Sequence, residues 1–378
     1  MRIFSQFDSG NIRVVNDDDI NNIQLAIHND NQSEFYQWFH FRLEAQVNQA
    51  HTLHIQQLAG SAYPEGWQDY QAVASYDRDT WFRVPTEFDG DTLTIKVTPQ
   101  HGSMYFAYFA PYSYERHLDL IHQAQTYPQC QLETLGQTLD GRDISLLKIR
   151  SELSESAQPK TPIWLIARQH PGETMAEWFI EGLLDRLLDD TDTTARALLA
   201  KADVYVVPNM NPDGSVRGHL RTNAVGANLN REWQAPTLER SPEVYHVRAR
   251  MEQTGVKMCL DIHGDEAIPY NFVAGCEGIP SYDARMADLE DRFKRALLTV
   301  TPEFQDEHGY DKDAPGKANL TVGSNWIGER FNCLSYTVEM PFKDHNDQPD
   351  PDFGWSPARS QAFGRDMLSA ILKVVDAL

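Results

Sequence analysis

The sequence predicts a two-part protein in which a small antiparallel β-sandwich precedes a larger α/β domain with a largely parallel or mixed sheet. Three observations support this fold class. The chain has 378 residues, more than one typical hydrophobic core organises. Its first third alternates apolar and polar residues as strands do, whereas the remainder places short apolar runs between helical stretches. We expect the two parts to cover residues 1–118 and 119–378.

The first part shows the period of two that marks half-buried strands. In residues 92–98 every second side chain is apolar, and residues 39–43 repeat the pattern. The aromatic run MYFAYF at 104–109 has strong strand propensity. Turn-forming clusters at 89–91 and 100–102 separate these runs, as expected for a sandwich of short strands.

A predicted helical linker at 115–125 leads into the second part. Within that part, residues 151–162 are predicted to form a polar surface loop. The apolar runs of the second part are short enough for buried strands and lie at 163–167, 204–207, 258–262 and 336–338. Amphipathic helical stretches alternate with them at 174–188, 281–298 and 357–378. Functional residues of such a domain are expected where strands end and loops begin.

Bulk charge limits the classes of partner. The chain carries 33 basic and 55 acidic residues, a formal charge of -22, which disfavours nucleic acid or an anionic membrane as partner. No apolar run reaches about 18 residues, and residues 1–10 do not resemble a secretion signal, so we expect a cytoplasmic protein. The four cysteines form no C-x-x-C pattern and are expected to be buried free thiols.

The motif His170-Pro171-Gly172-Glu173 follows the apolar run 163–167 and opens a predicted helix. Residues three apart at a helix start lie on one side, so the imidazole of His170 and the carboxylate of Glu173 can converge on one ion. Pro171 suits the beginning of a helix, and Gly172 lets the backbone turn sharply.

A second H-x-x-E pattern, HGDE at 263–266, shows that the motif is weak on its own. For either match alone, a surface histidine beside a solvated acid is the better interpretation. The setting adds weight, because His263 closes the run 258–262 and Glu339 closes the run 336–338. Two histidines, one carboxylate ligand and one free carboxylate are what hydrolytic zinc chemistry requires, with one metal position left open for water.

Two arginines lie between these motifs. Arg221 and Arg231 beside a buried metal need anionic partners, and the C-terminal carboxylate of a substrate is an apt one. A guanidinium can also stabilise a developing oxyanion. Asp261 either orients His263 or caps the strand end, and we weigh both interpretations equally. His219 is interpreted as a packed residue.

The ordered set of motifs resembles the metallocarboxypeptidase A superfamily, and the whole chain is similar to its cytosolic carboxypeptidase branch, which includes tubulin-deglutamylating enzymes. The matching segments, spanning about residues 130 to 345, are LDGRDISLLKI, RQHPGET, NPDG, HLRTN, ANLNREW, DIHGD and SYTVEMPF. The sandwich ending in YFAYFAPYSY is similar to the extra domain of that branch.

The resemblance implies one zinc ion held by His170, Glu173 and His263, with Glu339 as the general base. It also implies that Glu266, the acid of the second H-x-x-E pattern, is not a ligand.

For the substrate, the resemblance implies that Arg221 polarises the scissile carbonyl. It further implies that Asn230 and Arg231 bind the terminal carboxylate.

The chain departs from the family pattern at two positions. Secreted members have a mobile tyrosine upstream of the catalytic glutamate; anchored on Trp326, that position is Lys317 here, and the nearest upstream tyrosine is Tyr310. Either the tyrosine comes from a shifted loop, or the protein works without it. The base of the specificity pocket maps near Ser324, which selects neither basic nor acidic residues.

We therefore expect a zinc metallocarboxypeptidase that hydrolyses the C-terminal peptide or isopeptide bond of a peptide or protein, with acidic C-terminal residues as the candidate preference. Two alternatives stay open. One is a zinc amidase or deacylase that acts on N-acyl amino acids. The other is a binding module whose second domain is catalytically inactive. The sequence leaves the oligomeric state open.

Overall fold

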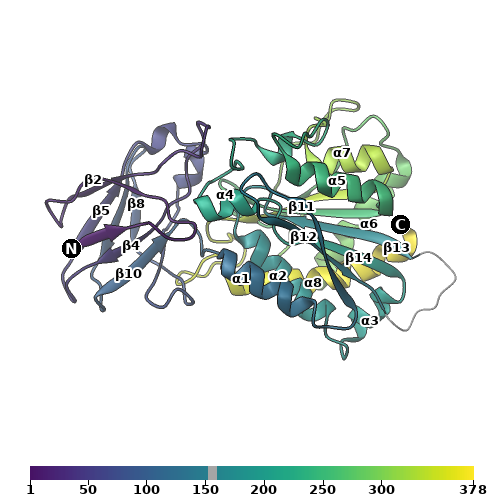
Figure 1. Cartoon of the computed structure of the whole chain (residues 1–378), viewed down its shortest axis with the longest axis horizontal. Helices are drawn as coiled ribbons and strands as arrows, with labels where there is room; N and C mark the ends of the chain where they lie inside the picture. The colour runs from purple at the N-terminus through teal and green to yellow at the C-terminus, as the bar shows by residue number, and fades with distance from the viewer. Residues whose placement is uncertain (152–159) are drawn as a thin grey trace.

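The computed structural model describes residues 1–151 and 160–378 and divides into two parts that lie side by side (Figure 1). The N-terminal sandwich occupies one end of the molecule, and the larger α/β part occupies the other and carries the C-terminus. The polar loop predicted at 151–162 falls largely outside the described residues. The predicted fold class is confirmed.

Two five-stranded sheets form the N-terminal part, in the orders β1-β4-β10-β6-β7 and β2-β3-β5-β9-β8. The alternating apolar residues of the predicted strands point inwards, so that Phe41, Leu43, Leu93 and Ile95 are fully buried. The strands are β1 (Arg2–Phe4), β2 (Arg13–Asn16), β3 (Ile23–Ala26), β4 (His40–Glu44), β5 (His51–Ile55), β6 (Val73–Ser75), β7 (Phe82–Arg83), β8 (Thr86–Phe88), β9 (Leu93–Val97) and β10 (Ser103–Ala107).

One strand pair of the sandwich is parallel rather than antiparallel. β3 pairs with β5 in parallel register, Ile23 opposite Leu53, while the other pairs in both sheets are antiparallel. The reason is topological. The chain crosses to the other sheet as β4 before it returns, so β5 enters beside β3 in the same direction.

A seven-stranded mixed sheet in the order β11-β12-β14-β13-β15-β17-β16 forms the centre of the second part. Its four middle strands are parallel, and the pairs at the edges, β11 with β12, β12 with β14 and β16 with β17, are antiparallel. The strands are β11 (Cys130–Gln137), β12 (Asp143–Ile149), β13 (Thr161–Ala167), β14 (Ala202–Val207), β15 (Met258–Asp265), β16 (Phe272–Ala274) and β17 (Leu334–Pro341). The four predicted strands are therefore the four parallel ones.

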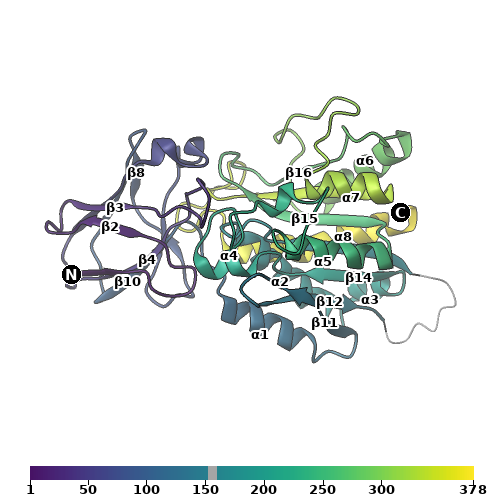
Figure 2. The ribbon, with the colours of Figure 1, turned by 45° about the horizontal axis from the view of Figure 1, so that its top comes forward.

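Helices cover both faces of this sheet. Alternate residues of β13 are buried against opposite faces, Leu165 towards α2 and α8 and Trp164 towards α5. Figures 1 and 2 show α5 and α7 on one face and α2, α3 and α8 on the other. The helices are α1 (Tyr114–Ala124), α2 (Met175–Leu187), α3 (Thr193–Leu199), α4 (Pro212–Arg217), α5 (Pro242–Thr254), α6 (Ala284–Val300), α7 (Gly323–Phe331) and α8 (Pro357–Val374).

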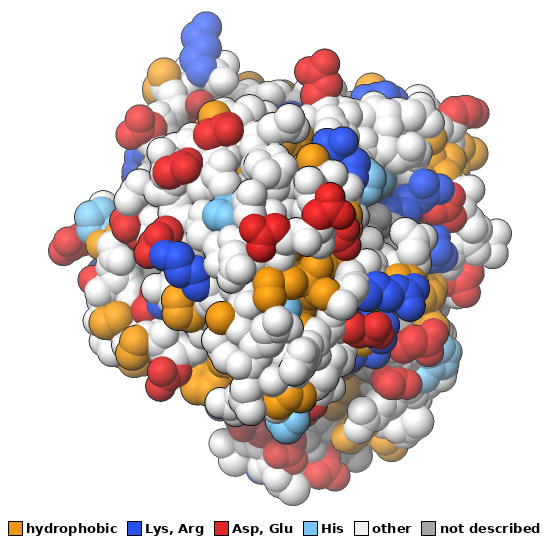
Figure 3. All heavy atoms as spheres, turned by 90° about the vertical axis from the view of Figure 1, so that its left-hand side faces the viewer, with side chains coloured by type: hydrophobic (Ala, Val, Ile, Leu, Met, Phe, Trp, Pro, Cys, Tyr) orange, Lys and Arg blue, Asp and Glu red, His pale blue; other side chains and the backbone are white. Residues whose placement is uncertain are grey.

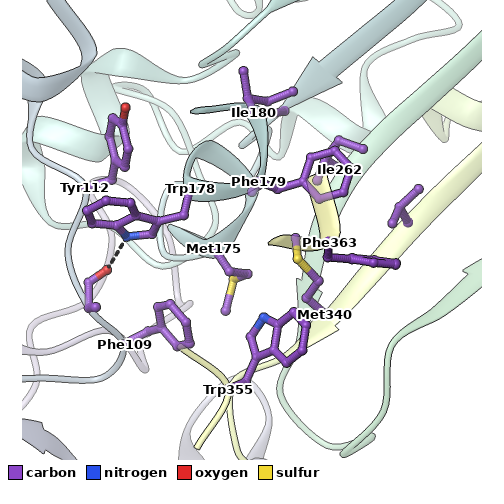
Figure 4. Packing of buried hydrophobic residues seen from close by; sticks show 14 of the residues in the cluster. Phe109, Tyr112, Met175, Trp178, Phe179, Ile180, Ile262, Met340, Trp355 and Phe363 are labelled. Carbon is purple, nitrogen blue, oxygen red and sulfur yellow. Dashed lines mark hydrogen bonds between the residues drawn. The ribbon is translucent and has the colours of Figure 1, made fainter. Parts of the chain in front are cut away.

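The start of α2 packs against the end of the sandwich, as Figure 4 shows. Trp178 donates a hydrogen bond from its indole nitrogen to the Ala110 carbonyl at 3.1 Å, and Thr174 donates to the same oxygen at 2.8 Å. Further along, α2 touches α8 closely, because a Cβ at Gly182 would lie 2.0 Å from the Gln361 carbonyl. The helix that follows the candidate metal motif is thus held at its start and near its middle.

The expected division after residue 118 stays a prediction. That position lies inside α1, which contacts β11 and β12 of the second part.

The four cysteines are free and buried, as predicted. Acidic side chains are spread over the outer face of the sandwich with basic ones among them (Figure 3). None of the described helices combines the length and apolar character needed to cross a bilayer.

Candidate active site

Three buried side chains converge near the carboxyl ends of the parallel strands. His170 and Glu173 lie in the turn from β13 to α2, and His263 lies on the neighbouring strand β15. Their relative exposures are 3%, 3% and 1%. One ligand atom from each lies within 4.8 Å of the others, so the three form a candidate metal site.

The two imidazoles present the same nitrogen to the carboxylate. Nδ1 of His170 lies 2.7 Å from Glu173 Oε1, and Nδ1 of His263 lies 2.7 Å from Oε2. Both Nε2 atoms face away, towards Asn228 Oδ1 at 3.1 Å and Asp261 Oδ1 at 2.9 Å. Two nitrogens and one carboxylate oxygen that point at one place are a donor set that fits zinc.

Supporting residues fix the orientation of these rings. Asp261 is itself held, because Gln169 donates to its Oδ2 at 2.6 Å and Trp233 donates to Gln169 at 2.8 Å. Asp261 lies inside β15 and within ion-pair distance of His263 Nε2, so the structure favours the orienting interpretation over a cap at the strand end. Sequence reasoning missed Asn228, although it lies in the ANLNREW segment.

Electrostatics favour the metal-binding protonation state for two of the three side chains. Burial and the nearby Arg221 lower the pKa of His170 to about 3, which keeps its imidazole neutral. Burial acts to raise the pKa of Glu173, but the contacts with His170 and His263 outweigh it and hold that pKa below its ordinary value. A neutral imidazole and an ionised carboxylate are the forms that bind a cation. For His263, burial acts to lower the pKa, but the carboxylates of Asp261 and Glu173 outweigh it and raise that pKa, so this imidazole gives up a proton when a cation binds.

Glu339 lies opposite His263 in the parallel register of β17 and β15. Both strands run two residues beyond these positions, so the residues sit inside the strands rather than at their ends. Oε2 of Glu339 is buried and has no hydrogen-bond partner among the described residues. Burial, with the nearby Glu173 and Asp265, raises the pKa of Glu339 well above its usual value against the opposing effect of His263.

A tyrosine does reach the site, from a shifted loop. The hydroxyl of Tyr310 lies 2.7 Å from Asp265 Oδ2 and 3.2 Å from Glu339 Oε1, and its ring packs edge-on against Phe272. Lys317, which occupies the family's tyrosine position in the sequence, has an exposed side chain. The structure thus brings Tyr310, and not Lys317, to the carboxylates.

The substrate-binding candidates line the same cavity as the triad. Arg221, Asn230 and Arg231 are all part of its wall. Among the described residues, the guanidinium of Arg221 contacts the rings of Phe35 and Tyr63, and that of Arg231 donates to the Asn230 carbonyl at 2.6 Å, so neither contact is with a carboxylate. Desolvation and the nearby Arg221 lower the pKa of Arg231, since two guanidiniums share this space. Asn230 is held by Gly323, whose backbone N–H donates to Oδ1 at 2.7 Å.

The cavity has a volume of about 770 Å³ and is shared between the two parts of the molecule. Tyr63 and Glu65 of the sandwich line it together with Ser324 of α7. Glu266, the acid of the second H-x-x-E pattern, is buried in the wall beside Gly66 and stands outside the triad. Burial and nearby carboxylates raise the pKa of Glu266 well above its usual value.

Two family models match the chain. The cytosolic carboxypeptidase N-terminal domain matches residues 3–109, and the zinc carboxypeptidase model matches residues 117–362. Among curated proteins, cytosolic carboxypeptidase 1 of Homo sapiens is 27% identical over 323 residues, which cover 73% of this chain and 26% of that protein. This chain therefore spans about a quarter of the length of that relative.

Solved structures match over the whole chain. A metallo-carboxypeptidase from Burkholderia cenocepacia is 49% identical, with a TM-score of 0.97 over 99% of each chain. A metallo-carboxypeptidase from Pseudomonas aeruginosa, in complex with (2-guanidinoethylmercapto)succinic acid, is 48% identical, with a TM-score of 0.97 over 100% of each chain. Because the zinc carboxypeptidase model covers more than half of the sequence and includes the converging triad, this chain belongs to the zinc carboxypeptidase family, whose members are peptidases that use one zinc ion.

Proposed function

We propose that this enzyme releases the C-terminal residue of a peptide or protein with metal-activated water. His170, Glu173 and His263 hold the zinc ion, and Glu339 is the general base. One observation carries the proposal: two guanidiniums without carboxylate partners among the described residues face the cavity that contains the triad and the free Oε2 of Glu339.

The residues divide the reaction between them. A zinc ion held by the triad would supply Lewis-acid chemistry that lowers the pKa of water. Glu339 would take up a proton at Oε2 and release it to the leaving amine.

The arginines bind the substrate. Arg231, with Asn230, receives the terminal carboxylate, which is the anionic partner that the two guanidiniums lack. Arg221 faces the carbonyl of the bond to be cleaved and stabilises its negative charge as water adds. Tyr310 extends this side of the site, since its hydroxyl already contacts Glu339.

The decisive experiment separates metal binding from proton transfer. In the zinc-loaded enzyme, Glu339→Gln should lower turnover of an acyl-dipeptide by about 10²–10⁴-fold and retain zinc. His170→Ala should lose zinc as well as activity. Loss of zinc from the Glu339→Gln protein would contradict a role as base. Turnover as low in the native protein as in both variants would support the inactive binding module.

A zinc amidase that acts on N-acyl amino acids would use the same triad. The cavity of about 770 Å³, which extends from the triad to Tyr63 and Glu65 of the sandwich, instead leaves room for a peptide. We therefore expect hydrolysis of acyl-dipeptides to exceed that of N-acetyl amino acids. Activity confined to N-acetyl amino acids would reverse the choice.

The preference for an acidic terminal residue is a finer proposal. Lys312 and Lys294 line the cavity and support it, but Lys312 pairs with Glu277 at 2.9 Å and Lys294 with Asp306 at 3.1 Å. Cleavage of isopeptide bonds is a further proposal, which rests on the resemblance of the chain to the cytosolic carboxypeptidase branch.

Glu277 favours a second candidate, a basic terminal residue. It lines the cavity, and the Pseudomonas relative binds a compound that joins a guanidine group to succinic acid. In this chain, Glu277 would receive such a guanidine while Arg231 binds a carboxylate. Comparing kcat/KM for one peptide ending in Glu, Lys or Arg decides between these preferences.

A further inference from the structure

The segment that carries Arg221 has no helix or strand of its own and rests against the sandwich. Just before it, Gly218 accepts a hydrogen bond from the Asn11 side chain at 2.9 Å. Just after it, the Ala224 carbonyl accepts one from the Asn31 side chain at 2.6 Å. His219, predicted as a packed residue, accepts at Nε2 from the Asn31 backbone N–H at 3.0 Å.

One carboxylate of the sandwich organises the centre of this segment. Asp30 is 2% exposed and accepts hydrogen bonds from three successive backbone N–H groups. Leu220 donates to Oδ1 at 2.7 Å, while Arg221 and Thr222 donate to Oδ2 at 2.8 Å each. The Thr222 hydroxyl adds a fourth bond at 3.1 Å. Because four donors of three successive residues converge on one buried carboxyl group, Asp30 holds the backbone of Arg221 in place.

The same segment touches the metal motif on its other side. The backbone N–H of Gly172 donates to the Leu220 carbonyl at 2.8 Å. A Cβ at Gly172 would lie 3.0 Å from that oxygen, so a glycine permits the close approach. Leu220 thus bridges Asp30 of the sandwich and the turn between His170 and Glu173.

The side chain of Arg221 is also held by the sandwich. Its guanidinium carbon lies 5.7 Å from the centre of the Phe35 ring and 5.4 Å from that of the Tyr63 ring. Phe35 belongs to the turn that contains Asp30, since the Asp30 N–H donates to the Phe35 carbonyl at 2.8 Å. One turn of the sandwich therefore contacts both the backbone and the guanidinium of Arg221.

We propose that the sandwich is a working component of the catalytic site, in which Asp30 is a positioning residue that aims Arg221 at the substrate carbonyl. This inference rests on the proposed role of Arg221. Asp30 acts through the backbone of residues 220–222, and Phe35 restricts the guanidinium. A displacement of about 1 Å in such a group can cost up to about a hundredfold in rate.

The test uses Asp30→Ala in the full-length, zinc-loaded enzyme. Turnover of an acyl-dipeptide should fall by about 10–100-fold while zinc content stays native. Asp30→Asn keeps one acceptor oxygen and should recover part of that turnover. In a double-mutant cycle, Asp30→Ala should cause no further loss once Arg221→Ala is present, because both changes remove the same interaction.

The matched control is Asp8→Ala. Asp8 is another sandwich carboxylate that accepts a backbone N–H hydrogen bond, from Tyr114 at 2.7 Å, but it does so at the start of α1 rather than in the Arg221 segment. Its variant should keep native turnover. If Asp30→Ala does not fold, Phe35→Leu replaces it and should lower turnover severalfold, again without further loss beside Arg221→Ala.

The outcomes separate the two claims. Native turnover in the folded Asp30→Ala and Phe35→Leu proteins, beside a defective Arg221→Ala protein, overturns the positioning role and leaves the proposed function standing. Additive losses in the double variants also overturn it. If Arg221→Ala itself keeps native turnover, the proposed role of Arg221 fails first.

Discussion

The two sides of the cavity are built differently. On the metal side, His170, Glu173 and His263 lie on or directly after central strands of the sheet, and short contacts hold each of them within the same domain. On the substrate side, Arg221 and Tyr310 lie in segments without regular structure. The strands of the sheet position the residues of the metal side, whereas contacts with distant parts of the chain position those of the substrate side.

This difference separates the expected consequences of substitution. Substitution of a residue that supports a metal ligand should lower zinc affinity, because that residue helps to orient the imidazole ring. Substitution of Tyr310, or of a residue that holds Arg221, should change kcat/KM and leave zinc bound. Each prediction below tests one side of this comparison.

The largest effect is expected for Asp261→Asn on the metal side. The amide keeps the shape of the side chain but removes the negative charge beside His263 Nε2, 2.9 Å away. Loss of such a supporting partner lowers zinc affinity by roughly 10–100-fold, which competition with a chelator measures. Exposed Asp190→Asn is the control. Native zinc affinity in the Asp261 variant would show that the sheet alone orients the ring.

The residues that the sequence predicts on the metal side converge in the structure for a physical reason. His170 and Glu173 are close in sequence and follow an apolar strand, and the parallel register of neighbouring strands brings Glu339 opposite His263. The local sequence pattern and the geometry of a parallel sheet are therefore enough to predict that these residues lie close together. The fold followed for the same reason, because the four apolar runs are the four parallel strands.

On the substrate side, the contacts that hold Arg221 and Tyr310 could not be predicted in this way. Asp30 bonds to the Arg221 segment across 191 positions, and no local pattern marks that contact. Tyr310 lies 29 positions before Glu339, outside the spacing that led to Lys317. Long loops do not preserve spacing, so their contacts appear only in three dimensions.

A smaller effect is expected for Tyr310→Phe on the substrate side. The change removes one hydroxyl that contacts both Asp265 and Glu339, an interaction worth about 1 kcal/mol, or roughly fivefold in kcat/KM. Zinc content should not change. Lys317→Ala is the matched comparison, because that side chain is exposed, and it should behave as the native enzyme. A larger defect in the Lys317 variant would return the role to the position that the family spacing marks.

The smallest effect is expected for Glu266→Gln, at the junction of the two sides. Glu266 has the sequence pattern of a ligand, yet it lies in the cavity wall beside the sandwich and outside the triad. Burial raises the pKa of its carboxyl group, so the protonated form that glutamine mimics is already favoured. Zinc content and kcat/KM should therefore stay near native when both are measured on the same preparation.

Loss of zinc would place Glu266 among the ligands and remove the distinction between the two H-x-x-E patterns. A selective loss of kcat/KM with zinc retained would instead move Glu266 to the substrate side, where contacts from the sandwich set the geometry.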